Sequence, residues 1–294
     1  MEELESEWAD PWEHARLLSD MDRNNVLIKL LQRHAPGATV IEVGCGTGVW
    51  SVLAAKLGAR RVLALEPSDL WTSARDLVVE NGLQDVVSVL PISVEALAAD
   101  GLPDDWQGAD LIFSELLNAD PLAEGIVAAS AAARGLLAVG GVLAPDRIEL
   151  FAALAEAEAH TDLAGARSEL ARIAAGWDLD LDSVVELLEE ADIEPFVSPS
   201  VRLCSAPTKL CTLHLGNGAL PPRLRFCATS EQPAAGATLW WRAHYGPDLV
   251  MSNAPGTPNH WGQLVCAWPD PVPAGDVGVE IEFEDGSVRL TPAQ

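Results

Sequence analysis

The chain has 294 residues, of which 49% are hydrophobic, and its formal net charge at pH 7 is −26. This length allows two domains of ordinary size with a sizeable core. The acidic balance argues against nucleic acid as a partner, because phosphate binding needs a basic face. It suits a cationic substrate, although a solvated acidic surface that keeps the protein soluble is the simpler explanation of the charge.

No apolar run approaches the roughly 20 residues that a membrane-spanning helix needs. The first seven residues are acidic, unlike the basic start of a signal peptide. Neither a zinc site nor a disulfide framework is indicated, because the five cysteines form no C-x-x-C pair. We therefore expect a cytoplasmic protein that binds no metal and no membrane.

Short apolar strands alternate with helices between Val40 and Leu150, which is the pattern of a parallel sheet covered by helices. Strands are expected at 39–43, 61–65, 86–90, 110–114 and 142–150, and helices at 50–57, 72–81 and 122–137. Gly140-Gly141 is expected to make the turn into the last of these strands. The first half is therefore predicted to be a Rossmann-like α/β domain.

The second half has a different pattern. Helices are expected at 161–175 and 182–190, followed by short strands at 201–203, 209–215, 224–228, 238–244, 264–268 and 277–283. Gly- and Pro-containing turns separate the strands, which indicates a β-sandwich or β-barrel with a helical insertion. We place the first domain at 1–149 and the second at 150–294, with the insertion at about 158–192.

The loop after the first strand carries the most specific local signal. It reads Glu42-Val43-Gly44-Cys45-Gly46-Thr47-Gly48. Glycines let the backbone approach a ligand without Cβ clash, and the next helix presents free N–H groups. The third glycine comes one residue too early for the dinucleotide fingerprint G-x-G-x-x-G.

Acidic residues around this loop indicate the ligand. Glu42 can accept hydrogen bonds from an ammonium group, and Glu66, just after the second strand, suits both hydroxyls of a ribose. Val94 and Glu95 follow the third strand, where an adenine edge would lie. We therefore predict an S-adenosylmethionine site formed by these residues with Gly44, Cys45, Gly46 and Gly48. A glycine turn in an unrelated α/β protein is the alternative, and the acids in register disfavour it.

Three further segments resemble the protein arginine methyltransferase family, and the likeness runs from about Trp12 to the C-terminus. They are Glu13-His14 to Arg23-Asn24, Ser114-Glu115 to Glu124, and Asn259-His260-Trp261-Gly262-Gln263. The first resembles the family's segment that closes over the cofactor. The second resembles its loop with two glutamates nine positions apart, and the third its Thr-His-Trp loop. The resemblance implies a methyltransferase domain followed by a β-barrel.

The glutamate pair suits a guanidinium, whose planar fork of N–H donors carboxylates match bidentately. Glu115 and Glu124 would hold the group from two sides and aim one nitrogen at the methyl group, so positioning supplies much of the acceleration. Either Glu124 or the pair Asp20 and His260 would accept the proton. That Asp20 and His260 pair with each other is implied by the resemblance.

The resemblance assigns three more residues. Arg23 would hold the carboxylate of the cofactor's methionine part, His14 would belong to the lid over the cofactor, and Trp261 would line the arginine channel and stack on the planar cation. Each has a plainer alternative as a surface or packing residue.

The chain departs from the family pattern in the glutamate loop, which lacks the usual Tyr. Ile126 stands near the position associated with the degree of methylation, and we expect monomethylation. The segment at about 161–191 takes the place of the family's dimerisation arm, so a homodimer is expected, or else it covers the active site.

The composition is typical of bacteria, where family members often serve specialised metabolism such as natural-product biosynthesis. We therefore expect free L-arginine or a small arginine-containing metabolite as the substrate. The alternatives are peptidyl arginine, another nucleophile, or a non-catalytic scaffold that binds the cofactor.

Overall fold

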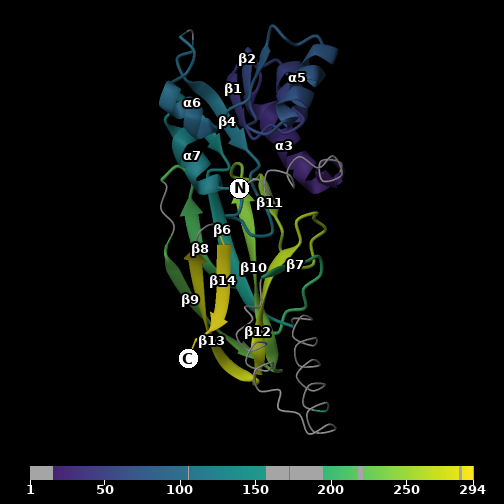
Figure 1. Cartoon of the computed structure of the whole chain (residues 1–294), viewed down its shortest axis with the longest axis vertical. Coiled ribbons are helices and arrows are strands. Elements are labelled where there is room, and N and C mark those ends of the chain that lie inside the picture. The colour runs from purple at the N-terminus through teal and green to yellow at the C-terminus, as the bar shows by residue number, and fades with distance from the viewer. Residues whose placement is uncertain are drawn as a thin grey trace.

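The computed structural model describes residues 16–104, 106–156, 172, 195–217, 221–284 and 287–293. A parallel sheet with helices forms one end of the molecule, and antiparallel sheets form the other (Figure 1). No helix in these ranges is long and apolar enough to cross a membrane.

The parallel sheet has five strands in the order β3-β2-β1-β4-β5. Its strands are β1 (Thr39–Val43), β2 (Arg61–Leu65), β3 (Val87–Leu90), β4 (Ala109–Ser114) and β5 (Leu137–Ala144). Its helices are α3 (Met21–His34), α4 (Val49–Lys56), α5 (Leu70–Glu80), α6 (Val94–Asp100) and α7 (Ile126–Arg134). The strand order reverses beside β1, and ligands of open α/β sheets bind at the carboxyl ends of the strands at such a point.

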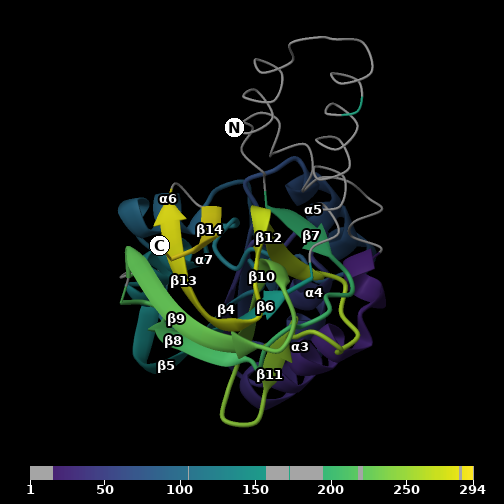
Figure 2. The same ribbon diagram turned by 90° about the horizontal axis from the view of Figure 1, so that it is seen from below.

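The antiparallel half contains one sheet of order β7-β12-β10-β6-β8, with β11 paired to β10, and a second of order β14-β13-β9. The strands are β6 (Arg147–Ala155), β7 (Phe196–Ser198), β8 (Thr208–His214), β9 (Arg223–Ser230), β10 (Ala234–His244), β11 (Val250–Ser252), β12 (Gln263–Val272), β13 (Gly275–Glu284) and β14 (Ser287–Pro292). Because β8 contacts β9 and β12 contacts β14, the two sheets close into a barrel (Figure 2).

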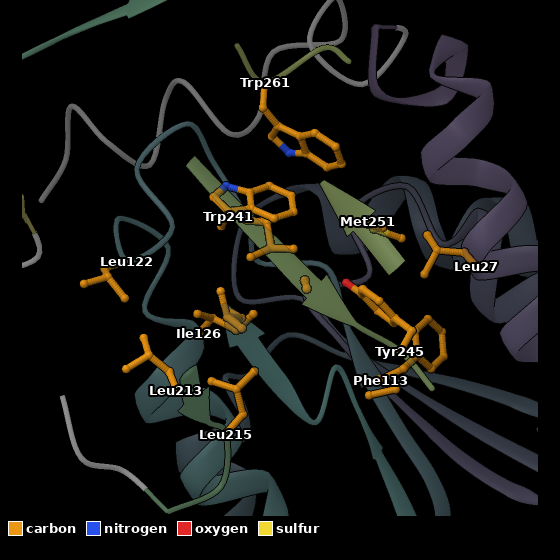
Figure 3. Packing of buried hydrophobic residues seen from close by; sticks show 14 of the residues in the cluster. Leu27, Phe113, Leu122, Ile126, Leu213, Leu215, Trp241, Tyr245, Met251 and Trp261 are labelled. Atoms are coloured by element: carbon orange, nitrogen blue, oxygen red, sulfur yellow. The ribbon is translucent and has the colours of Figure 1, made fainter. Parts of the chain in front are cut away.

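One hydrophobic core joins the two halves. Leu27 of α3 and Phe113 of β4 belong to the same buried cluster as Trp241, Tyr245 and Met251 of the barrel (Figure 3). Strand β6 alternates partly buried and buried side chains from Arg147 to Ala152, as expected for a strand with one face on the core, and it is buried throughout from Ala152 to Ala155. The shared core fixes the barrel against the carboxyl ends of the parallel strands.

Most predicted strands are confirmed, and three local predictions are wrong. Gly140-Gly141 lies inside β5 rather than in a turn, because a register shift against β4 brings Gly141 so close to Ala109 O that a Cβ would lie 2.5 Å away. The predicted strand 142–150 is two strands, β5 and β6. The predicted helix 122–137 is shortened to α7, because Gly125 in a left-handed conformation starts it late.

The segment at 201–203 makes only an isolated bridge, in which Leu203 pairs with Ala155. Strands β7, β11 and β14 and helices α3 and α6 were not expected. The predicted helices at 161–175 and 182–190 lie outside the described residues, apart from Arg172, and the domain boundary at 149/150 stays a prediction.

Candidate active site

A cavity of about 770 Å³ opens at the carboxyl ends of β1, β2 and β4, against the barrel. Ten of the predicted site residues line it: Arg23, Glu42, Gly44, Cys45, Gly46, Glu66, Glu115, Glu124, His260 and Trp261. Asp20 lies just behind His260, whereas Gly48, Val94 and Glu95 do not line the cavity. His14 lies outside the described residues.

The glycine loop forms one wall of the cavity. Gly44 has a φ of 70°, a left-handed conformation that favours glycine, and a Cβ there would lie 2.8 Å from Leu116 Cδ2, so Leu116 would have to shift. Gly48 has a different role, because a Cβ on it would lie 2.9 Å from Ala74 Cβ. It lets α4 pack closely on α5.

Glu66 is held by the loop that it faces. Its Oε2 accepts from Gly46 N at 2.8 Å, and its Oε1 accepts from Ser68 N at 3.0 Å and from Ser68 Oγ at 2.6 Å. These bonds fix the carboxylate before any ligand arrives. Oε2, which accepts from Gly46 N alone among these donors, still has lone-pair capacity for a ribose hydroxyl.

Glu42 is almost fully buried and accepts a hydrogen bond from the Ser51 hydroxyl. Burial raises the pKa of Glu42 to about 8, while Ser51 and Arg23 act in the opposite direction. A positively charged ligand beside it would favour the carboxylate form. This is the environment expected for a carboxylate that pairs with an ammonium group.

Cys45 and the start of α6 add little chemistry. Burial raises the pKa of the Cys45 thiol, so it is not a nucleophile. Val94 is packed in the core at the first position of α6, which Ser93 caps by accepting from Ala96 N at 3.3 Å. An adenine contact with Val94 and Glu95 stays a prediction.

Glu115 binds a guanidinium in this structure, that of Arg23. Arg23 Nε donates to Glu115 Oε2 at 2.5 Å, and Arg23 Nη2 lies 2.5 Å from the same oxygen. Both side chains are less than a tenth exposed, and the Arg23 guanidinium lies 5.8 Å from the centre of the Trp50 ring. Burial raises the pKa of Glu115, and Arg23 opposes that shift.

Glu124 faces the same space from the end of the loop. Burial, followed by repulsion from Glu115, raises the pKa of Glu124 well above its usual value, while Arg23 acts the other way. Burial thus disfavours the charged form of both acids, and a further cation bound between them would stabilise it. Two like charges around one site are the arrangement expected for a guanidinium clamp.

The barrel supports this loop through backbone acceptors. Trp241 Nε1 donates to Asn118 O at 2.7 Å, and the Tyr245 hydroxyl donates to Ser114 O at 2.9 Å. No sequence pattern indicated a function for Tyr245 or for Trp241. Together they fix both the start and the middle of the two-glutamate loop.

Asp20 and His260 are paired across 240 residues of sequence. Asp20 Oδ2 lies 2.8 Å from His260 Nδ1 and accepts from His260 N at 3.2 Å, while Oδ1 caps α3 by accepting from Arg23 N at 3.0 Å. Burial raises the pKa of Asp20, but the bonds from Arg23 and His260 outweigh it and lower that pKa.

Burial also lowers the pKa of His260 to about 4, although Asp20 opposes the shift. The imidazole is therefore neutral at pH 7. Its hydrogen bond to Asp20 assigns the proton to Nδ1, so Nε2 is an acceptor.

Trp261 completes the wall between the barrel and the two-glutamate loop. Its ring lies edge-on to Trp241 with centroids 4.8 Å apart (Figure 3). The centroids of the Trp261 and His260 rings are 4.0 Å apart. Its loop is held by Asn259 Oδ1, which accepts from Gly262 N at 2.8 Å, and by Asn253 Nδ2, which donates to Gly262 O at 2.8 Å.

Three lining residues have buried polar atoms without a hydrogen-bond partner: Glu115 Oε1, His260 Nε2 and Trp261 Nε1. The indole N–H approaches Glu115 and favours its charged form, but not in hydrogen-bond geometry. Leaving such groups unpaired costs about 1–3 kcal/mol each, which indicates a site shaped for a polar ligand. In the part of the chain that the structure describes, no cluster of side chains could hold a metal ion.

Comparisons with known proteins agree with this geometry. The family model of ribosomal protein L11 methyltransferase matches residues 25–169. An arginine N(omega)-methyltransferase of Streptomyces achromogenes subsp. streptozoticus is 28% identical over 288 residues, covering 95% of this chain and 78% of that protein.

Solved structures show the same fold over nearly the whole chain. Arabidopsis thaliana protein arginine methyltransferase 10 has a TM-score of 0.81 at 20% identity, covering 98% of this chain and 94% of that one. The Trypanosoma brucei PRMT1 enzyme–prozyme heterotetrameric complex with AdoHcy has a TM-score of 0.73 at 22% identity, covering 94% and 88%. With the paired glutamates and the Asp20–His260 contact, these matches identify the chain as an S-adenosylmethionine-dependent methyltransferase that is similar to arginine methyltransferases in sequence and in fold.

Proposed function

We propose that the protein transfers a methyl group from S-adenosylmethionine to a guanidino nitrogen of free L-arginine or of a small arginine-containing metabolite. The observation that carries this proposal is the Arg23–Glu115 contact. This contact supports the proposal because the Glu115 carboxylate already binds a guanidinium in it, and Glu124 lines the same cavity with its pKa raised by burial.

The cofactor would lie along the glycine loop. Glu66 would accept from its ribose hydroxyls, Glu42 would pair with its ammonium group, and Arg23 would pair with its carboxylate. When bound, S-adenosylmethionine supplies an electrophilic methyl group. Arg23 would then leave Glu115 open for the guanidinium of the substrate.

The residues of the substrate end would orient the acceptor and take up its proton. Glu115 and Glu124 would hold two edges of the guanidinium, which leaves one nitrogen aimed at the cofactor. Two groups can receive the proton released on methylation: the Glu124 carboxylate, and His260 Nε2, which is unpartnered. Trp261 would pack against the planar cation.

The choice of a small substrate rests on the Streptomyces relative, whose name specifies arginine rather than protein arginine. Peptidyl arginine is the second candidate, because other relatives, such as one from Arabidopsis thaliana that is 25% identical, are named protein arginine methyltransferases.

We further propose monomethylation, a cytoplasmic location, a homodimer and a role in natural-product biosynthesis. Ile126 is fully buried at the start of α7 and is not among the residues that line the cavity.

Incubation with methyl-labelled S-adenosylmethionine separates these substrates. We expect label in free L-arginine, chiefly as the monomethyl product, and little in peptides with an internal arginine. Label in peptides alone would overturn the small-substrate proposal. Cofactor binding by calorimetry without turnover on any guanidine would instead favour the non-catalytic alternative.

A further inference from the structure

Glu66, at the cofactor end of the cavity, has used most of its hydrogen-bonding capacity before any ligand binds. An ionised carboxylate has about four lone-pair sites, two on each oxygen. Among the described residues, Ser68 N and Ser68 Oγ donate to Glu66 Oε1, and Gly46 N donates to Oε2. Both sites of Oε1 are therefore occupied, whereas Oε2 has one left.

The Ser68 hydroxyl is directed at Glu66 by a second contact. Because an ionised carboxylate only accepts, the hydroxyl is the donor in the bond of 2.6 Å to Oε1, and its oxygen accepts from Leu70 N at 3.4 Å. A hydroxyl bond to a carboxylate at this short distance is charge-assisted and about twice as strong as a bond between neutral groups. A ribose hydroxyl would have to displace such a bond in order to reach Oε1.

This pattern bears on the cofactor because Glu66 and Ser68 both line the cavity beside the glycine loop. Glu66 is buried and Ser68 is half-buried, so few other acceptors of the chain can replace the carboxylate there. S-adenosylmethionine presents two neighbouring hydroxyls on one edge of its ribose. Two hydroxyls need two acceptor sites, and the carboxylate has one to offer.

We infer that Glu66 recognises one of the two ribose hydroxyls, through Oε2, and that Ser68 excludes the other hydroxyl from Oε1. This inference rests on the cofactor position in the proposed function and narrows the role of Glu66 there from both hydroxyls to one. Ser68 is a positioning residue, because it acts on the cofactor through the carboxylate of Glu66. The second hydroxyl would keep its bonds to water.

Calorimetry with S-adenosylhomocysteine and its 2′-deoxy and 3′-deoxy forms measures what each hydroxyl contributes. In the unaltered protein, we expect one deletion to weaken binding by about 10- to 100-fold, the range for a hydrogen bond to a charged group. The other deletion should weaken binding by no more than about threefold, because that hydroxyl loses only bonds to water. Equal losses from the two deletions would overturn the inference and leave the cofactor position standing. If even the 2′,3′-dideoxy form binds as tightly as S-adenosylhomocysteine, Glu66 does not face the ribose and the proposed cofactor position itself fails.

Ser68→Ala tests whether Ser68 causes the asymmetry. The variant keeps the backbone N–H at position 68 but frees one lone-pair site on Oε1, so the second deletion should then cost about 10-fold as well. The ratio of the two losses is the readout, because a general loss of stability or of affinity would leave this ratio unchanged. Ser68→Thr retains the hydroxyl and should keep the asymmetry of the unaltered protein.

Ser73→Ala is the matched control, because Ser73 is exposed on α5, the helix that follows Ser68. This variant should bind all the ligands as the unaltered protein does. An asymmetry of the same size in Ser68→Ala and in Ser73→Ala would overturn the role of Ser68.

Discussion

The two ends of the cavity are built in different ways. At the cofactor end, the carboxylates are held by residues close in sequence: Glu42 by Ser51, and Glu66 by Gly46 and Ser68. At the substrate end, the side chains come from distant segments, and polar atoms of Glu115, His260 and Trp261 have no partner. The first end is thus ordered by its own loop, whereas the second depends on the barrel to hold it.

Because of this difference, we expect cofactor binding and turnover to respond differently to substitutions at the two ends. A preformed cofactor end loses little conformational freedom when its ligand binds. The substrate end keeps an unpaired oxygen of Glu115 and an unpaired imidazole nitrogen of His260 at an energetic cost, which a polar ligand would relieve. Changes at the substrate end should therefore reduce turnover much more than they reduce cofactor affinity.

The largest effect is expected from Glu115→Gln. It removes the negative charge that binds a guanidinium, so kcat/KM for L-arginine should fall by about 100- to 1,000-fold, as for the loss of a preorganised electrostatic contact. Cofactor affinity, measured by calorimetry, should change far less. Glu80→Gln, an exposed change at the end of α5, is the matched control. Retention of most activity in Glu115→Gln would contradict the clamp.

A smaller loss is expected from His260→Ala. The variant loses the acceptor at Nε2, but Glu124 can still take up a proton, so kcat should fall by about 10- to 100-fold, the low end for general base catalysis. Asp20→Asn should have a similar effect on kcat, and the double variant should be no worse than the single ones, because the two residues act as one unit. Additive losses in steady-state kinetics would show that the residues act separately.

The cofactor end could be predicted from sequence because its information is local. The glycine loop and Glu66 lie within one β-α-β segment, and β1 and β2 begin and end where the apolar runs do. The residues of the substrate end were identified by resemblance, since no local pattern shows that Asp20 meets His260.

Contacts to backbone atoms could not be predicted at all. Tyr245 and Trp241 support the glutamate loop by donating to Ser114 O and Asn118 O. Because every residue has a backbone carbonyl, residue types do not show which carbonyl accepts such a bond. The Arg23–Glu115 pair was missed for a related reason, since each residue was assigned to a separate ligand. The prediction of a turn at Gly140-Gly141 was wrong because glycines inside a strand can also indicate a close approach between neighbouring strands.

The buried Glu42 predicts an effect of pH on stability. Its pKa is about 8 in the folded protein and near 4.5 when unfolded, so folding takes up a proton between these values. The free energy of unfolding of the cofactor-free protein should fall as pH rises from about 4.5 to about 8. Glu42→Gln should reduce this slope and stabilise the protein at pH 8 by an amount on the order of a few kcal/mol, while weakening cofactor binding.

Urea denaturation between pH 5 and pH 8.5 measures this slope. Glu115 and Glu124 also have raised pKa values, so some slope should remain in Glu42→Gln. Saturating cofactor should reduce the slope in the unaltered protein, because a cation beside Glu42 favours the carboxylate. An identical slope in Glu42→Gln and in the unaltered protein would show that Glu42 is not the group responsible.

The smallest effect is expected from Tyr245→Phe, which tests whether the barrel orders the substrate end. The variant loses the buried hydrogen bond from the Tyr245 hydroxyl to Ser114 O, a cost of about 0.5–1.5 kcal/mol in urea denaturation. Thr238→Val is the matched control, because it removes a buried hydroxyl bond of 2.9 Å to Leu264 O within the barrel. Both variants should lose similar stability, but only Tyr245→Phe should lower kcat, since Ser114 directly precedes Glu115. Equal kcat values in the two variants would mean that the loop keeps its geometry without the barrel.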